Sequence, residues 1–178
     1  MEEKIKLHDR EFILSITASQ IQDAVARVAS AINRDMAGED LLFISILNGA
    51  FMFTADLLKR IGMNCQVTFV KLSSYRDASS TGIIKELIGL NEDIRGRSVI
   101  VVEDIVDTGA TLGRIMDQLT IHNPKQIRVA TLLLKPDVFK GKIPVDYVGL
   151  EVPNAFIVGY GLDYNGLGRN LEGIYEIV

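Results

Sequence analysis

Residues 98–112 read SVIVVEDIVDTGATL, and this stretch decides the fold. Its first part is strongly apolar, as is typical of a strand buried on both faces of a parallel sheet. After it, apolar residues recur at three- and four-residue steps and predict a helix over about 110–121. A buried strand therefore leads through a polar, glycine-containing turn directly into a helix.

Strand and helix patterns alternate along the chain up to Lys135. Helices are predicted over about 18–36, capped by Thr17 or Ser19 and ended by Gly38, and from the turn at Asn48 and Gly49 through about Arg60. Strands are predicted over 41–47, 65–72, 83–90, 98–105 and 127–135. This alternation predicts an α/β fold, with a central parallel sheet flanked by helices on both faces.

The pattern changes after Lys135. Prolines and glycines separate short strand candidates at 147–152, 156–160 and 174–178, and no clear helix follows. We predict one domain over 1–178, with a core at about 17–135 and a small C-terminal cap subdomain at about 136–178 that includes the N-terminal segment. Ligands of open α/β sheets bind beyond the carboxyl ends of the strands, where the turns at 48–49, 103–111 and 135 should meet.

Composition limits the possible functions. The chain has 178 residues, of which 48% are hydrophobic and 24% charged, so it can bury a core and is not disordered. One cysteine and two histidines cannot form an intrachain disulfide or an ordinary zinc site, so a metal would need oxygen ligands. A net charge of −4 without basic runs argues against nucleic acid as a partner. No signal segment or membrane span is apparent, which favours a cytoplasmic location.

The turn at 108–111 has the chemistry of a phosphate site. Its amides open a helix, and Thr108 and Thr111 add hydroxyl donors. Glu103 and Asp104 would repel a phosphate but suit sugar hydroxyls or Mg²⁺. A sugar phosphate satisfies both halves of the motif. The plainer interpretation is a strand end with solvated acids and a capping threonine.

Five motifs give the sequence a close resemblance to the hypoxanthine-guanine phosphoribosyltransferases of purine salvage, which have the type I phosphoribosyltransferase fold. They are EDIVDTGATL (103–112), LNGA (47–50), KLSSY (71–75), LLLK (132–135) and PNAFIVGYGLDYNGLGR (153–169). The resemblance implies that hypoxanthine or guanine attacks C1′ of Mg²⁺-bound 5-phosphoribosyl-1-diphosphate (PRPP). Diphosphate then leaves, and IMP or GMP forms with inversion.

The resemblance also implies a role for each residue of the PRPP motif. Thr108, Gly109, Ala110 and Thr111 would bind the 5′-phosphate, while Glu103 and Asp104 would bind the ribose hydroxyls and the metal. Asp107 would be the catalytic base that takes the proton from purine N7. Aspartate is a weak base unless the closed site desolvates it, and Asp107 could instead only cap the helix.

Four further residues are expected to bind the purine: Lys135, Phe156, Ile157 and Asp163. Lys135 would donate to O6, and because an ammonium has only donors, it favours 6-oxopurines over adenine. Phe156 would stack on the ring, and the backbone of Ile157 would meet its Watson–Crick edge. Taken alone, Lys135 could be a solvated strand end and Phe156 an ordinary core residue. The choice among hypoxanthine, guanine and xanthine stays open.

The remaining roles concern the diphosphate. Asn48, Gly49 and Arg169 would bind it, and Asp163 would also hold a second Mg²⁺, although Asp163 and Arg169 could be ordinary surface charges. Many relatives carry lysine where this chain has Asn48, and the resemblance implies a cis peptide between Leu47 and Asn48. Ser74 and Tyr75 lie in the polar segment 73–82, a loop or hairpin arm that would close as a lid and exclude water.

Two other functions compete with purine salvage. An RNA-binding regulator with this fold would need a basic face, which the acidic balance opposes. A phosphoribosyltransferase for another base, such as adenine or orotate, fits Lys135 and Phe156 poorly. The family also implies a homo-oligomer, either a dimer or a tetramer.

Overall fold

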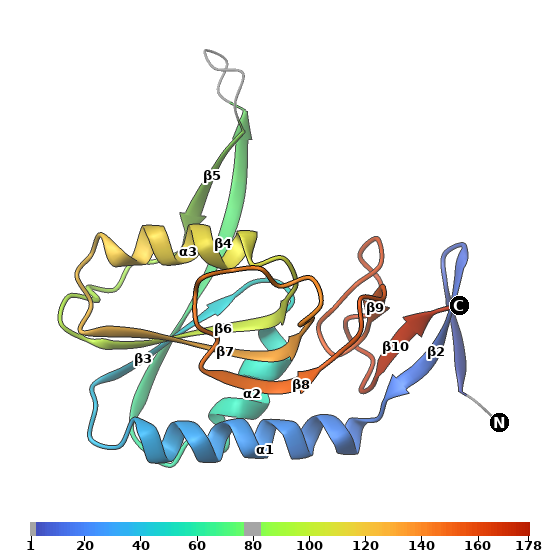
Figure 1. Ribbon diagram of the computed structural model, residues 1–178, viewed down its shortest axis with the longest axis horizontal. Helices are drawn as coiled ribbons and strands as arrows, with labels where there is room; N and C mark the ends of the chain where they lie inside the picture. Colours follow the sequence, from blue (N-terminus) through green and yellow to red (C-terminus); the bar gives the residue numbers. More distant parts are fainter. Residues whose placement is uncertain (1–2, 77–82) are drawn as a thin grey trace.

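The computed structural model describes residues 3–76 and 83–178, and all of their side chains except those of 73–76 and 83–88 (Figure 1). A six-stranded sheet forms its centre. The strand order is β5 (Ile83–Ile88), β4 (Cys65–Arg76), β3 (Leu41–Ile46), β6 (Ser98–Val106), β7 (Gln126–Leu134) and β8 (Tyr147–Glu151). The last five are parallel, and β5 pairs antiparallel with β4. The predicted α/β class and central parallel sheet are confirmed.

Helices cover both faces of this sheet (Figure 1). Helices α1 (Ala18–Asp35) and α2 (Phe51–Leu58) pack on one face, and α3 (Ala110–Thr120) packs on the other. The side chains of β3 alternate between these two layers, so all six of its residues are buried. This explains why the central strands are apolar without a polar face.

Local signals set the start of α1. Thr17 accepts a hydrogen bond from Gln20 N at 3.3 Å, and the Gln20 side chain accepts one from Thr17 N at 2.9 Å. This reciprocal pair is a capping box, so Thr17, rather than Ser19, is the cap. The helix ends before Gly38, whose φ of 81° is accessible mainly to glycine.

Two predicted boundaries were wrong. Strand β4 continues to Arg76 instead of ending at 72, and it pairs with β5 up to Arg76 and Ile83, forming an arm that projects from the sheet (Figure 1). Strand β8 belongs to the main sheet instead of the cap, because it pairs with β7. A Cβ at Gly149 would lie 2.6 Å from Leu132 O, so glycine lets β8 pack closely on its neighbour.

A second sheet forms the cap. Its strand order is β1 (Lys4–Leu7), β2 (Arg10–Ile16), β10 (Ile174–Ile177) and β9 (Ile157–Val158). The N-terminal segment therefore joins the C-terminal segment, around a small core of Phe12, Val158 and Tyr175. The cap lies beyond the carboxyl ends of β6 and β7 (Figure 1). Of the helices described, none is long and apolar enough to cross a membrane.

Candidate active site

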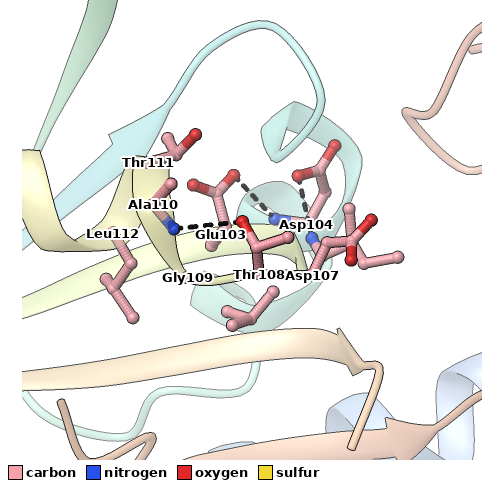
Figure 2. Close-up of a pocket in the computed structure, with 10 residues that line it drawn as sticks. Glu103, Asp104, Asp107, Thr108, Gly109, Ala110, Thr111 and Leu112 are labelled. Carbon is pink, nitrogen blue, oxygen red and sulfur yellow. Dashed lines mark hydrogen bonds between the residues drawn. The ribbon is translucent and has the colours of Figure 1, made fainter. Parts of the chain in front are cut away.

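The turn between β6 and α3 encloses the first cavity of the site. Residues 103–112 line a volume of about 270 Å³ (Figure 2). Gly109 has a φ of 83° and precedes the first residue of α3, and a Cβ there would lie 2.7 Å from the ring of Phe139. Ala110 N donates to Thr108 Oγ1 at 3.3 Å (Figure 2). The structure thus brings Thr108, Gly109, Ala110 and Thr111 together at a helix N-terminus, which suits an anion.

The acidic pair forms the floor of this cavity. Glu103 is only 7% exposed, and its Oε1 accepts a hydrogen bond from Asp104 N at 3.2 Å (Figure 2). Burial is the main cause that raises the pKa of Glu103 well above its ordinary value, and the negative charge of the neighbouring Asp104 raises it further. Among the ion pairs of the described residues, none includes Glu103 or Asp104. Cations or hydroxyl groups from a ligand would relieve this concentration of carboxylates.

The pair fits Mg²⁺ as an open site. The described residues contain no cluster of three or more His, Cys, Asp or Glu side chains placed to hold a metal. Mg²⁺ is commonly held by one or two carboxylates, with substrate oxygens and water completing its shell. Glu103 and Asp104 provide two carboxylates in the lining of the first cavity. The donor set therefore suits a metal that arrives with a phosphorylated substrate.

The loop after β3 packs directly against the acidic pair. A Cβ at Gly49 would lie 1.5 Å from Asp104 Oδ2, so any larger residue there would displace the Asp104 carboxylate. The peptide between Leu47 and Asn48 is cis, as the family resemblance implies. Leu47 N donates to Val70 O at 2.8 Å, which ties the loop to β4. The loop therefore packs behind Asp104, and Asn48 and Gly49, both predicted to bind the diphosphate, line neither cavity.

A second cavity of about 230 Å³ opens between the β6 end and the cap. Its lining includes every residue predicted to bind the purine, together with Arg169: Asp104, Ile105, Asp107, Lys135, Ala155, Phe156, Ile157, Leu162, Asp163 and Arg169. Asp104, Ile105 and Asp107 also line the first cavity. The two cavities therefore meet at the end of β6, with Asp107 between them.

Lys135 projects into this second cavity from the end of β7. Its side chain is 9% exposed, and Nζ lies 3.4 Å from Asp107 Oδ2. Nζ also lies 3.5 Å from Asn154 Oδ1, a contact that the sequence did not predict. Lys135 is therefore a buried, paired cation rather than a solvated strand end.

Phe156 forms an aromatic wall of the same cavity. Its ring is edge-on to Tyr164 at 5.8 Å and tilted against Phe12 at 6.3 Å. It remains 47% exposed, so it is not an ordinary core residue. The neighbouring Ile157 begins β9 and also lines the cavity. This arrangement leaves aromatic surface available to a planar ligand.

Asp163 and Arg169 are brought together at the rim. They form an ion pair, Asp163 Oδ2 accepts from Gly166 N at 2.7 Å, and Arg169 Nη1 donates to Gly161 O at 2.6 Å. Both oxygens of Asp163 thus have protein donors already. A metal at Asp163 would have to share these oxygens.

Two of the predicted residues cannot be placed in full. Ser74 and Tyr75 lie in β4, where their backbones pair with Lys85 and Ile84. Their side chains, and all of residues 77–82 of the predicted lid, lie outside the described residues. Sequence reasoning in turn missed Asn154 and Phe139, because their contacts to Lys135 and Gly109 give no local signal.

A strand–turn–helix cavity that suits an anion, an acidic pair and an adjoining aromatic cavity are the features expected of an enzyme that handles sugar phosphates. Residues 16–165 match the model of the phosphoribosyl transferase domain family. The chain belongs to this family, and within it to the hypoxanthine-guanine phosphoribosyltransferases, as its relatives show.

Two relatives and two solved structures illustrate the similarity. The hypoxanthine-guanine phosphoribosyltransferase of Mycobacterium tuberculosis is 43% identical over 166 residues, covering 89% of this chain and 82% of the relative. The hypoxanthine phosphoribosyltransferase of Escherichia coli is 39% identical over 143 residues, covering 80% of each chain. A hypoxanthine-guanine phosphoribosyltransferase structure from Bacillus anthracis has a TM-score of 0.83 at 36% identity, covering 98% of each chain. A Trypanosoma cruzi hypoxanthine phosphoribosyltransferase structure has a TM-score of 0.85 at 30% identity, covering 99% of this chain and 96% of the other.

Proposed function

We propose that the protein transfers the 5-phosphoribosyl group of PRPP to N9 of hypoxanthine or guanine, releasing diphosphate and forming IMP or GMP. One observation carries this proposal: Asp104, Ile105 and Asp107 line both the phosphate cavity and the aromatic cavity. A ribose placed at this junction would have its 5′-phosphate on one side and the purine on the other. The names of the relatives point to the same substrates.

The 5′-phosphate and ribose would be bound by the turn and the acidic pair. The amides at the start of α3 and the hydroxyls of Thr108 and Thr111 would donate to the phosphate oxygens. Glu103 and Asp104 would accept hydrogen bonds from the ribose hydroxyls and hold Mg²⁺. The metal would supply positive charge to the departing diphosphate.

The purine would bind between Lys135 and Phe156. Lys135 Nζ would donate to O6 while keeping its contact with Asp107, because an ammonium has three donors. Asp107 would accept the N7 proton as the new glycosidic bond forms. Phe156 would stack on the ring, and the backbones of Ile157 and Asp163 would meet its other edge. Adenine would present an amino donor to Lys135 and be disfavoured.

The diphosphate would leave past the loop after β3. Asn48 carries no charge, so the Gly49 amide and the Arg169 guanidinium would provide most of its contacts. Ser74 and Tyr75 would close over the reacting atoms and exclude water, which would otherwise hydrolyse the ribosyl intermediate. The proposal also includes a second Mg²⁺ at Asp163. To bind it, the Asp163 oxygens would have to coordinate the metal while they accept from Arg169 and Gly166.

The proposal includes self-association. Val67 and Phe69 follow each other at two-residue spacing on β4 and are 40% and 44% exposed. Their parallel partners Phe43 and Ser45 face the α2 side of the sheet, so Val67 and Phe69 lie on that face beyond the cover of α2. A second copy of the chain would bury this apolar surface in a dimer or tetramer.

The predicted cytoplasmic location also stays part of the proposal.

A base panel tests the function. Purified protein, Mg²⁺ and PRPP are incubated separately with hypoxanthine, guanine, xanthine, adenine and orotate, and the nucleotides are separated by chromatography. IMP and GMP are expected, with little or no AMP. Adenine or orotate turnover above that of hypoxanthine would contradict the assignment of Lys135. Salt-sensitive RNA binding without turnover would instead favour a regulator of this fold.

A further inference from the structure

Tyr160 joins the cap to helix α2. It lies between Gly159 and Gly161 in the cap, and its side chain packs into the core beside α1 and α2 with only 3% exposure. Its hydroxyl donates to Asp56 Oδ2 at 2.6 Å. Asp56 is in α2, the helix that follows the loop after β3. The bond therefore spans two parts of the chain that are 104 residues apart.

Three side chains donate to Asp56. Besides the hydroxyl of Tyr160, Gln22 Nε2 of α1 donates at 2.7 Å, and Lys59 Nζ lies 2.6 Å from Oδ1. Burial raises the pKa of Asp56, but the bonds from Lys59, Tyr160 and Gln22 outweigh it and lower the pKa overall. Burial and the Asp56 bond raise the pKa of Tyr160. A carboxylate thus accepts from a protonated phenol, which is a strong, charge-assisted bond.

Gly161, the residue after Tyr160, contacts the loop after β3 and Arg169. A Cβ at Gly161 would lie 2.0 Å from Gly49 O, just as one at Gly49 would lie 1.5 Å from Asp104 Oδ2. Gly161 also exchanges hydrogen bonds with Arg169, at 2.6 Å through its carbonyl and 2.9 Å through its amide. Gly161 therefore touches both groups that we assign to the diphosphate, Gly49 and Arg169.

We propose that Tyr160 and Asp56 are positioning residues for the diphosphate of PRPP. Neither residue lines the two cavities, and in this proposal each acts through Gly161 instead of contacting the substrate. Their bond holds Gly161 against Gly49 and thereby fixes the loop amide and the guanidinium at the leaving group. This inference rests on the proposed function, and it adds a determinant of diphosphate affinity outside the binding surface.

Four variants test it: Tyr160→Phe, Asp56→Ala, the double variant and Tyr175→Phe. Tyr160→Phe keeps the buried ring and removes only the hydroxyl. Tyr175→Phe is the matched control, because the Tyr175 hydroxyl also donates to a carboxylate, Glu3, at 2.6 Å, but in the cap sheet away from both cavities. The readouts are the KM values for PRPP and hypoxanthine, kcat, the Kd for Mg²⁺-diphosphate by calorimetry, and the unfolding midpoint. Binding is measured at a temperature well below the unfolding midpoint of each variant, so that every variant is folded.

We expect the KM for PRPP and the Kd for diphosphate to rise about fivefold in Tyr160→Phe and in Asp56→Ala. The double variant should be no weaker than the poorer single variant, because both remove the same bond. The KM for hypoxanthine should stay within about twofold, and Tyr175→Phe should lower only the midpoint.

Two results would overturn the proposal. One is a diphosphate Kd in Tyr160→Phe and Asp56→Ala that matches Tyr175→Phe, which would make the bond merely structural. The other is an equal loss of affinity for diphosphate and hypoxanthine. Wild-type turnover tests the proposed function separately, because the diphosphate titration needs neither a purine nor a reaction.

Discussion

Lys135 Nζ and Asp107 Oδ2 lie 3.4 Å apart at the wall of the aromatic cavity. The proposed donor to purine O6 and the proposed acceptor of the N7 proton are thus adjacent, as O6 and N7 are on a purine. A 6-oxopurine can be bound by both residues at once. The pair therefore links recognition of the base to activation of its nucleophile.

Replacing Lys135 by Met should lower kcat/KM for hypoxanthine by about 10- to 100-fold, since the buried O6 loses its charged donor. The KM for PRPP should change much less, because Lys135 does not line the phosphate cavity. Steady-state kinetics with each substrate varied in turn measure both effects. A larger loss for PRPP than for hypoxanthine would show that Lys135 has a different role.

Asp107→Asn should reduce kcat by about 10²- to 10⁴-fold if the carboxylate is the general base. The amide has similar size and keeps one acceptor oxygen, so the Kd for IMP should change only slightly. Stopped-flow turnover and calorimetric titration with IMP provide the comparison. Equal losses in turnover and IMP affinity would instead indicate a positioning role.

Gly49→Ala should weaken PRPP binding by more than about tenfold, because its methyl would collide with Asp104 Oδ2 at 1.5 Å. The matched control is Gly113→Ala in α3, where the nearest atom is Ile143 Cδ1 at 3.8 Å. The control should retain PRPP affinity and raise stability by about 0.5–1 kcal/mol, since alanine favours the helix. Similar PRPP affinity in both variants would contradict the close packing at Gly49.

Glu103→Gln should raise the unfolding midpoint at neutral and alkaline pH while abolishing tight binding of Mg²⁺-PRPP. The raised pKa means that protonated Glu103 favours the folded state, and that stability is lost as pH rises through the folded pKa. The gain from glutamine should therefore vanish below about pH 4, the ordinary range of a glutamate. Thermal melts from about pH 3 to 9 follow this difference. A constant difference across the range would exclude ionisation as its cause.

Val67→Lys with Phe69→Lys should shift the protein toward monomer, because two charges would be desolvated in the proposed interface. Ile121→Lys is the control, since Ile121 is an apolar residue with 73% exposure at the end of α3. Sedimentation velocity at several concentrations measures the mass. An unchanged mass in the double variant would place self-association elsewhere or exclude it.

The sequence predicted the elements that depend on short-range pattern. The strand, turn and helix at 98–120 follow from apolar spacing, and the capping box at Thr17 sits where the helix signal begins. The residues that line the two cavities fall within three of the five motifs, 103–112, 132–135 and 153–169, whereas Asn48 and Gly49 of the LNGA motif line neither cavity. The motifs could not provide the cap contacts, because Tyr160 and Asp56, or Gly161 and Gly49, are separated by more than a hundred residues.

The sequence by itself determined an α/β chain with a glycine-containing turn before a helix, an acidic pair and a lysine at a strand end. These properties follow from residue type and spacing within about a dozen positions. Only the tertiary structure decided that β8 completes the sheet, that Asn154 joins Lys135, and that Gly161 rests on Gly49 and Gly49 on Asp104. The reason is that each of these relationships joins segments apart in the sequence, and whether Gly161 fits on Gly49 or Gly49 on Asp104 depends on distances below 3 Å that no local pattern records.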